Sequence, residues 1–374
     1  MQFKPDKIIF KPQDVDLTYS PLRSGIDSGT YVLGAFNPGL TRLPNGNLMM
    51  IVRVAEALTN PIEGTMIHGI KWEDGSYRLE SYPLDEVITD DPRKFVLKKY
   101  LPTTVYALTS LSWLLPVELD PDGLEVLSVH YDKIIAADRP SQEYGIEDAR
   151  ISFIEGKYYM TTCTVSSERH ATTLYSSDNG LDYHFEGIVL DHQNKDMLLF
   201  EGKIGEQYYA MTRPLGMLYF DTGDRSDYYA GPSINLATSP DLIHWKPTDL
   251  PFIRSRKGSE FTNRIGGGTP PVLTPEGWLA LFHGVVSSGA VGIYRTYWVL
   301  LDRQNPNKVI KLEDREALLE SRPELTQDLE DQKYLYDVVF STGIVDAGKH
   351  YIVASGELDL ACRITHIPKS FFGL

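Results

Sequence analysis

Residues 45–53, NGNLMMIVR, place a glycine-containing turn directly before an aliphatic run that ends on Arg53. A turn followed at once by an apolar run predicts a β-hairpin whose second strand is buried. The arrangement occurs four more times in the chain. The other copies run from Gly156 to Cys163, from Gly205 to Arg213, from Gly277 to His283 and from Gly348 to Ser355. Five such units predict an all-β fold, which we interpret as a five-bladed β-propeller.

The blade arrangement also predicts where a site lies. The first strand of each propeller blade runs beside a central axis, so side chains at the strand ends converge on one funnel. We therefore expect a single domain, residues 1–374, with a substrate site built from all five blades. Residues 1–30 carry no strong pattern and fit either an arm that wraps the propeller or an arm that contacts another subunit.

The spacing of the five units is uneven. The long interval between Gly46 and Gly156 must hold extra strands or an insertion. Within it, residues 85–101 are polar and charged, and they predict a surface loop.

Composition limits the classes of partner. The chain has 36 Lys and Arg residues against 51 Asp and Glu residues, for a net charge of −15. Nucleic acid and anionic membranes both need a basic face, so neither is expected as the main partner. An anion site must then be a local cluster of cations. A content of 42% hydrophobic and 11% aromatic residues is enough for a large core.

Targeting and metal signals are weak. The first residues lack the apolar stretch of a signal peptide, and no run of about 18 apolar residues occurs. We therefore expect a cytoplasmic protein. The two cysteines, Cys163 and Cys362, are too few for a disulfide framework. No group of His, Asp and Glu has the spacing of metal ligands, so no metal and no cofactor are expected.

The most specific motif is Gly-Ile-Glu-Asp-Ala-Arg at residues 145–150, directly before the second unit. Two acids beside an arginine are also common as a plain surface ion pair. Here the neighbouring residues favour a site, because the motif resembles the signature of glycoside hydrolase family 130. These are the β-mannoside phosphorylases and β-mannosidases, whose members are five-bladed propellers.

Other segments carry the same resemblance along most of the chain. The matching stretches are Phe36-Asn37-Pro38-Gly39 with Arg53-Val54-Ala55-Glu56, Asn194-Lys195-Asp196 through Lys203 to Arg213-Pro214, and Gly266-Gly267-Gly268 through His283-Gly284. The resemblance implies an inverting enzyme in which Asp148 is the sole general acid and its proton reaches the glycosidic oxygen through a sugar hydroxyl.

The nucleophile decides the reaction. Inorganic phosphate is already an anion and needs no base, so one acid suffices for a phosphorylase. A β-mannosidase needs a second carboxylate to activate water, and Glu201 or Glu260 fits that role. The leading hypothesis is a β-mannoside phosphorylase that makes mannose 1-phosphate. The alternatives are an inverting β-mannosidase and a non-catalytic sugar-binding propeller.

A phosphate site needs cations with well-placed donors. Lys203, Arg213 and His283 are the candidates, since they lie within or at the ends of the repeated strands. Taken one at a time, Lys203 also fits a solvated strand residue and His283 a core histidine. Their joint occurrence at positions that match the family favours the anion site, with phosphate as the co-substrate.

The mannose subsite needs hydrogen-bond donors, acceptors and an aromatic platform. We expect it to be formed by Asn37, Arg53, Arg150, Asp359 and Tyr294. An ion pair between Arg150 and Asp148 would lower the pKa of the acid, so Arg150 is expected to face substrate or phosphate. The resemblance is also compatible with a homo-oligomer, in which the N-terminal arm helps to shape the acceptor site.

Overall fold

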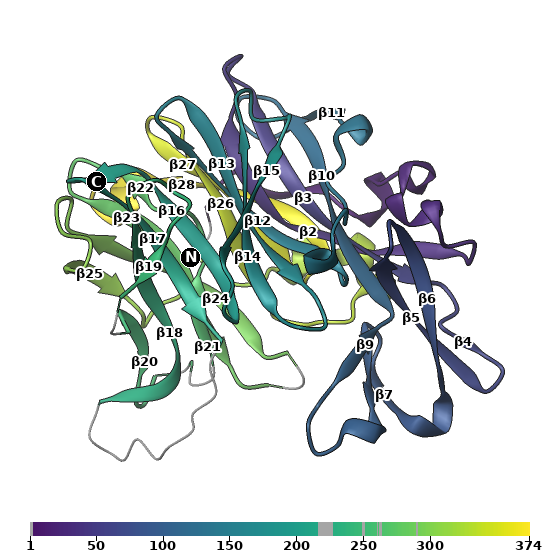
Figure 1. Ribbon diagram of the computed structural model, residues 1–374. Coiled ribbons are helices and arrows are strands. Elements are labelled where there is room, and N and C mark those ends of the chain that lie inside the picture. The colour runs from purple at the N-terminus through teal and green to yellow at the C-terminus, as the bar shows by residue number, and fades with distance from the viewer. Residues whose placement is uncertain (1–2, 216–226, 249–250, 260, 262–263, 289–290) are drawn as a thin grey trace.

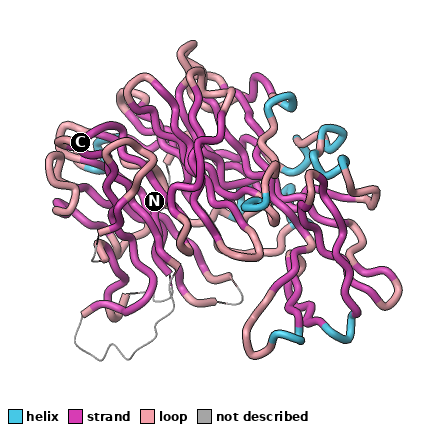
Figure 2. The backbone as a smooth tube through the Cα atoms, viewed as in Figure 1, coloured by secondary structure: helices cyan, strands magenta, loops and turns pink. Residues whose placement is uncertain are grey.

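The computed structural model describes residues 3–215, 227–248, 251–259, 261, 264–288 and 291–374. Within these residues the regular structure is mainly antiparallel β-strand (Figures 1 and 2). The described helices are short 3₁₀ turns and one four-residue α-helix, α1 (Lys369–Phe372). None of them is long and apolar enough to cross a membrane.

Five larger sheets follow one another along the chain. The first contains β2 (Thr30–Arg42), β3 (Leu48–Leu58), β10 (Ser110–Leu119) and β11 (Val126–Val129). The second contains β12 (Ile146–Ile154), β13 (Lys157–Val165), β14 (His170–Ser177) and β15 (His184–Leu190). The third contains β16 (Asn194–Ile204), β17 (Gln207–Pro214), β18 (Tyr228–Ser239), β19 (Lys246–Pro247) and β20 (Ile253–Arg256).

The remaining two larger sheets complete the series. The fourth contains β21 (Arg264–Gly267), β22 (Val272–Leu273), β23 (Trp278–Val286), β24 (Ile293–Leu301) and β25 (Val309–Glu313). The fifth contains β26 (Val339–Asp346), β27 (His350–Glu357), β28 (Ala361–Pro368) and the N-terminal β1 (Asp6–Phe10). The five strands predicted from the turn-and-strand units are β3, β13, β17, β23 and β27, and all five are confirmed as strands.

The first strands of the larger sheets lie against one another. β2 contacts β12, β12 contacts β16, and β16 contacts β21. The fourth sheet contacts β26 through β22 and β23, and β26 contacts β2, so the series of contacts returns to its start. Side chains at the ends of these strands are thereby brought to one region of the molecule.

The interval between the first two units holds an insertion of two three-stranded sheets. Their strands are β4 (Ile62–Glu63), β5 (Met66–Glu73), β6 (Ser76–Pro83), β7 (Val87–Asp91), β8 (Lys94–Leu97) and β9 (Tyr106–Leu108). Figure 1 shows them as a separate lobe beside the larger sheets. Residues 85–101, which the sequence predicted as a loop, include β7 and β8, so that prediction was wrong. Buried Phe95 and Leu97 alternate with the less buried Lys94 and Val96, and this period of two is that of a strand.

Three of the first strands are kinked at equivalent places. β2, β12 and β16 each carry a bulge in their pairing with the next strand. The residues at the bulges are Asn37 (φ 46°), Asp148 (φ 52°) and Asp196 (φ 53°). Asn and Asp tolerate this left-handed conformation better than most residues, and bulges re-aim side chains out of the regular alternation. The kinks therefore turn three polar side chains out of the strand pattern at neighbouring points.

The N-terminal residues wrap the protein's own fold. β1 pairs antiparallel with β28, so the first strand of the chain forms the edge of the last sheet. Asp6 on β1 accepts hydrogen bonds from Arg363 Nε at 2.7 Å and Nη2 at 2.8 Å, and from Arg322 Nη1 at 2.7 Å. Both Asp6 and Arg363 are buried. This paired charge fixes the two ends of the chain together.

We predict that Asp6→Ala destabilises the protein by about 3–5 kcal/mol, because it leaves Nε and Nη2 of the buried Arg363 without an acceptor and leaves Glu357 as the one carboxylate still paired with this guanidinium among the described residues. Urea denaturation followed by fluorescence measures the loss. The matched control is Asp328→Ala, which removes the partner of Lys11 in an exposed ion pair and should leave the unfolding midpoint unchanged. Equal midpoints for the two variants would contradict a closing role for Asp6.

Candidate active site

Asp148 lies at the centre of a polar cluster on the kinked strands. Its Oδ1 accepts a hydrogen bond from Arg53 Nη1 at 2.9 Å and another from Asn37 Nδ2 at 3.1 Å. The Oδ1 atom of Asn37 is buried and has no hydrogen-bond partner among the described residues. A buried acceptor without a partner is costly in water-free surroundings, and it marks a position where a ligand hydroxyl would be favoured.

Arg53 holds two acids at once. Its Nη2 donates to Glu147 Oε1 at 2.9 Å, and its Nε donates to Ser112 Oγ at 2.9 Å. Glu147 Oε2 also accepts from Lys195 Nζ at 2.7 Å. The guanidinium was expected to face mannose, and three of its five N–H groups donate to protein oxygens. The structure therefore makes Arg53 the residue that positions the acids.

The charges of this cluster shift one another's pKa values. Burial alone would raise the pKa of Asp148, but Arg53 outweighs it and holds that pKa below its usual value. Burial would likewise raise the pKa of Glu147, and Arg53 and Lys195 bring it far below its usual value. Both carboxylates are therefore ionised at neutral pH when the site holds no substrate.

Asp359 behaves differently from these two acids. Burial raises its pKa to about 6, against the opposing effect of Arg53 and Arg93 and with a further rise from Asp148. Asp359 lies just after β27 with φ 50°, and its backbone oxygen accepts a hydrogen bond from Tyr334 Oη at 2.9 Å. It is thus a carboxyl group that changes charge close to neutral pH, next to the ionised pair.

Asp196 connects a second group of cations. Its Oδ2 lies 2.8 Å from Arg213 Nε, and its Oδ1 lies 3.5 Å from Arg150 Nη2. Arg150 is buried, and its other donors bond to backbone oxygens, including Gly268 O at 2.6 Å and Asp148 O at 3.0 Å. Arg150 was expected to face substrate or phosphate. The structure instead directs it into the protein, because β12 turns at the bulge and points the side chain between strands.

His283 lies against this second group. Burial lowers the pKa of its imidazole well below the usual value, and Arg213, Arg150 and Arg264 add to that lowering. The ring is therefore neutral. Neither ring nitrogen makes a hydrogen bond of good geometry within the described residues. Tyr294 stacks on the imidazole, with ring centroids 5.5 Å apart.

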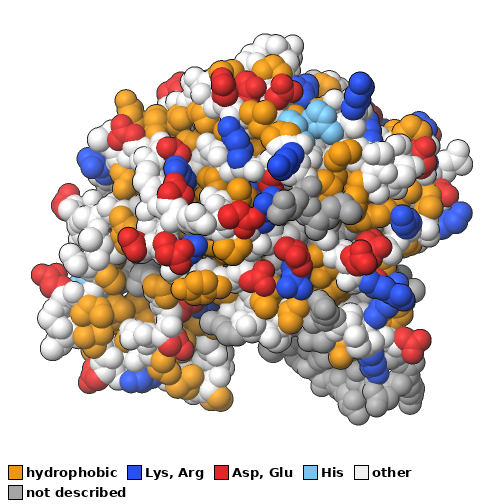
Figure 3. Space-filling view, turned by 180° about the vertical axis from the view of Figure 1, so that it is seen from behind, with side chains coloured by type: hydrophobic (Ala, Val, Ile, Leu, Met, Phe, Trp, Pro, Cys, Tyr) orange, Lys and Arg blue, Asp and Glu red, His pale blue; other side chains and the backbone are white. Residues whose placement is uncertain are grey.

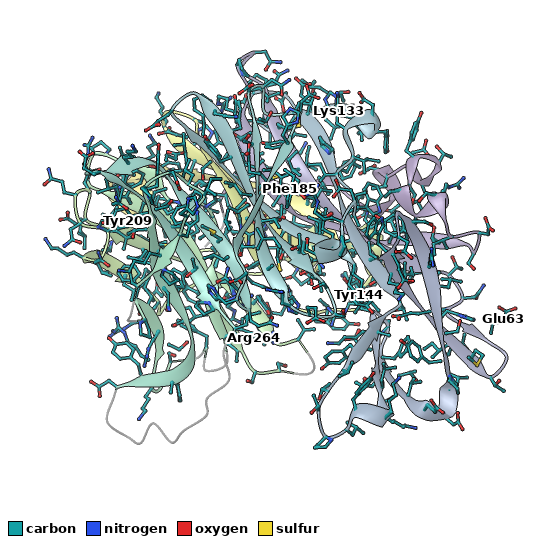
Figure 4. The ribbon with its side chains drawn as sticks, in the orientation of Figure 1. Glu63, Lys133, Tyr144, Phe185, Tyr209 and Arg264 are labelled. Carbon is teal, nitrogen blue, oxygen red and sulfur yellow. The ribbon has the colours of Figure 1, made fainter. Side chains whose placement is uncertain are left out.

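The backbone at Gly266 lets these groups meet. A Cβ atom there would lie 2.5 Å from His283 Cε1, 2.6 Å from Arg213 Cδ and 2.7 Å from Asp196 Oδ2, so a larger residue does not fit. Arg264, labelled in Figure 4, places its guanidinium carbon 5.7 Å from the centroid of the Tyr294 ring. Three guanidinium groups lie around His283, those of Arg150, Arg213 and Arg264. Asp196 is the carboxylate paired with Arg150 and Arg213. The surroundings have an excess of positive charge, which suits an anion.

The remaining predicted residues lie elsewhere. Lys203 is exposed on β16 and pairs with Tyr208 beside the turn, whereas Lys195 pairs with Arg213 at the other end of the strand. Eight residues of strand separate the two lysines, about 26 Å. The structure thus does not bring Lys203 to the cationic group. Glu201 is exposed on the same distal part of β16 and, like Lys203, is not brought to the cationic group. Glu260 lies outside the described residues.

Three site residues were not predicted from the sequence: Glu147, Lys195 and Asp196. All three belong to stretches that resemble family motifs, and they flank or occupy the bulges. The available signal was an Asp or Asn in the first strand of successive units, since such a residue favours a kink. Glu147 and Lys195 belong to the network of Asp148 and Arg53, and Asp196 belongs to the cationic group beside it. That arrangement can protonate a leaving oxygen and hold an anionic nucleophile.

Comparison with known proteins agrees with this chemistry. The sequence profile of glycoside hydrolase family 130, described as β-1,4-mannooligosaccharide phosphorylase, matches residues 112–370. A β-1,2-mannobiose phosphorylase from Listeria innocua is 29% identical over 344 residues, which are 90% of this chain and 88% of that protein. Another, from a Thermoanaerobacter species, is 30% identical over 280 residues, 74% of this chain and 83% of that one.

A solved structure gives the same result. The β-1,2-mannobiose phosphorylase from Listeria innocua, in complex with β-1,2-mannobiose, superposes with a TM-score of 0.81 at 26% identity and covers 98% of both chains. The family profile covers more than half of the present sequence. The chain therefore belongs to glycoside hydrolase family 130 and is a carbohydrate-active enzyme of the β-mannoside phosphorylase type.

Proposed function

We propose that this protein cleaves β-1,2-linked mannobiose and short β-1,2-oligomannans with inorganic phosphate, with inversion, to give α-mannose 1-phosphate and a shortened sugar. The observation that carries the proposal is the pairing of one acid network with an excess of guanidinium groups around the neutral His283. The choice of linkage is supported by similarity to relatives named for β-1,2-mannosides.

The chemistry assigned to Asp148 is proton donation. In the reaction the bond from the sugar anomeric carbon to the glycosidic oxygen breaks, that oxygen takes up a proton, and a phosphate oxygen bonds to the carbon. Asp148 supplies the proton, directly or through a sugar hydroxyl. The cations that keep Asp148 ionised also attract phosphate. A bound phosphate adds negative charge beside them, which raises the pKa of Asp148 and favours its protonated form.

Arg213 and His283 are proposed to bind the phosphate. Arg213 offers guanidinium donors beyond the one facing Asp196, and His283 offers a neutral imidazole without a well-formed hydrogen bond in the described chain. Arg150 lies behind them and adds charge. Lys195 replaces Lys203 in this proposal as the lysine of the site, because it lies at the inner end of β16.

Asn37 and Asp359 are proposed to bind the mannose that is transferred. The Oδ1 atom of Asn37 lacks a partner, and Gly356 leaves room for it, since a Cβ at Gly356 would lie 2.0 Å from that oxygen. Asp359 offers a second acceptor for the sugar, a carboxylate near Arg53. Tyr294 is proposed to border both subsites, because charged groups of both affect the pKa of its hydroxyl. Burial raises that pKa, Asp359 and Asp196 raise it further, and Arg213 opposes the rise.

The larger sheets are proposed to be the five blades of a single propeller domain. Support comes from the closed series of contacts between first strands and from β1, which joins the N-terminal residues to the last sheet. In that arrangement Asn37, Asp148 and Asp196 lie at the kinks of first strands, and Arg213 and Asp359 lie at or just beyond strand ends, where side chains face the axis.

We predict that Asp148→Asn lowers turnover by at least about a hundredfold, because the amide keeps the contacts to Arg53 and Asn37 but lacks an acidic proton. Formation of mannose 1-phosphate from β-1,2-mannobiose measures the rate. Thermal unfolding and mannobiose binding serve as controls and should stay close to those of the unmodified protein. A variant with nearly normal turnover would rule out Asp148 as the acid.

We predict that Arg213→Ala raises the KM for phosphate about tenfold or more, the effect of losing one charged hydrogen bond, and changes the KM for mannobiose much less. Lys203→Ala removes a cation from the same hairpin at its far end and is the matched control. Its kinetics should match those of the unmodified enzyme. An equal rise in both KM values for Arg213→Ala would argue against the anion site.

The ionisation of Asp359 should make sugar binding depend on pH. Because the pKa of Asp359 is about 6 in the folded protein, the group loses its charge as pH falls through that value. Glu147 and Asp148, whose pKa values are lowered, stay ionised in the same range. Affinity for mannobiose, measured by calorimetry without phosphate, should therefore decrease below about pH 6. In Asp359→Asn the affinity should be weaker and independent of pH between 5 and 7 (about one pH unit on either side of the midpoint). An unchanged pH profile in this variant would contradict the role of Asp359.

A further inference from the structure

The β7–β9 sheet of the insertion has one buried and one open face. Strand alternation places Phe95, Leu97 and Ala107 on the buried face, where they pack with Ile67 of β5 and Val87. The opposite side chains form what we call the open face. Its members are Ile88, Lys94, Val96, Tyr106 and Leu108. Figure 3 shows hydrophobic side chains gathered on the lobe that carries this sheet.

Tyr106 and Lys94 form the centre of the open face. The Tyr106 side chain is 44% exposed, and Lys94 Nζ lies 4.1 Å from the centroid of its ring. Lys94 is half-buried, and no hydrogen bond or ion pair to another side chain is found for it in the described part of the chain. An aromatic ring with a donor beside it matches what sugars bind, since the ring takes the C–H face and the donor takes a hydroxyl.

The open face belongs to the rim of the proposed site. Arg93, which precedes β8, places its guanidinium carbon 5.8 Å from the centroid of Tyr334, whose hydroxyl donates to the Asp359 backbone. Burial lowers the pKa of the Lys94 ammonium, and the nearby cations Arg93 and Lys195 add to that lowering. Lys94 follows Arg93 directly at the start of β8, so the open face begins beside the contact between Arg93 and Tyr334.

The direction of the reaction identifies the occupant. In an inverting displacement the nucleophile and the leaving group lie on opposite faces of the sugar ring. The group that attracts phosphate is formed by β17, β21 and β23 of the third and fourth sheets. The insertion extends from the first sheet and reaches the site from the side of Asp359 and Arg93. The leaving sugar must therefore project toward the insertion.

We propose that the open face of β7–β9, centred on Tyr106 and Lys94, binds the sugar on the leaving-group side of the scissile bond. This inference rests on the proposed function, because it assumes that a β-mannoside occupies the site. Tyr106 stacks on the apolar face of the leaving sugar, and Lys94 donates to one of its hydroxyls. In the reverse reaction the same face binds the acceptor sugar.

The test compares Tyr106→Ala with Tyr100→Ala. Tyr100 is a matched control, because it lies on the same insertion, is 46% exposed and has Lys99 Nζ 4.9 Å from its ring centroid. Two quantities are measured for each variant: the affinity for β-1,2-mannobiose without phosphate, and the KM for mannose as acceptor with mannose 1-phosphate as donor. Tyr106→Ala should weaken both by up to about tenfold, the value of one aromatic contact, and leave the KM for phosphate unchanged.

Each outcome decides between the proposals. If the two variants bind mannobiose and acceptor equally well, the open face is not a sugar subsite, even though the unmodified enzyme is active. If Tyr106→Ala alters only the oligomeric state in size-exclusion chromatography, the face contacts another copy of the chain, and the proposal fails. If the unmodified protein shows no phosphate-dependent turnover but Tyr106→Ala still binds mannobiose less tightly, the proposed function fails and the subsite stands.

Lys94→Met should repeat the loss of affinity seen in Tyr106→Ala, and Lys99→Met should not.

Discussion

The shared guanidinium of Arg53 is the interaction on which the site depends. It bonds to Asp148 and Glu147 at 2.9 Å each, and Glu147 in turn bonds to Lys195 at 2.7 Å. These residues come from β3, β12 and β16, so one charge network joins three sheets. Leaving any member alone would place an unpaired charge among buried strands, at a cost of several kcal/mol. The network therefore fixes the acid in place and also sets its ionisation before substrate binds.

The kinked strands explain how so many charges reach one place. A regular strand sends alternate side chains to opposite faces, where they would pack between sheets. The bulges at Asn37, Asp148 and Asp196 interrupt this alternation and turn polar groups out of it. In the fourth sheet Gly266 helps to bring the groups together, because its lack of a side chain leaves space for Arg213 and His283. The strained positions and the chemically active side chains are thus the same residues, a correlation expected of functional sites.

The sequence allowed the strands to be predicted better than the site. Glycine turns followed by apolar runs are local signals, and all five predicted strands are present. The motif at residues 145–150 also led to Asp148 as the proposed acid. Which side of a strand faces the centre is decided by bulges, which carry no strong local signal. That is why Lys203 was named as a candidate and Lys195 was not, and why the bonds of Arg53 and Arg150 to protein oxygens were not predicted. Spacing alone predicted extra strands or an insertion between the first two units, but residues 85–101 were predicted as a loop and contain β7 and β8.

The central claim is that the cationic group around His283 makes phosphate the nucleophile. The most direct measurement follows β-1,2-mannobiose and inorganic phosphate together by phosphorus and proton NMR. The account predicts that phosphate is consumed in equal amounts with mannobiose, that α-mannose 1-phosphate accumulates, and that nothing is cleaved when phosphate is left out. Release of two free mannose molecules at the same rate with and without phosphate would contradict it, because water would then be the nucleophile and the cationic group would need another explanation.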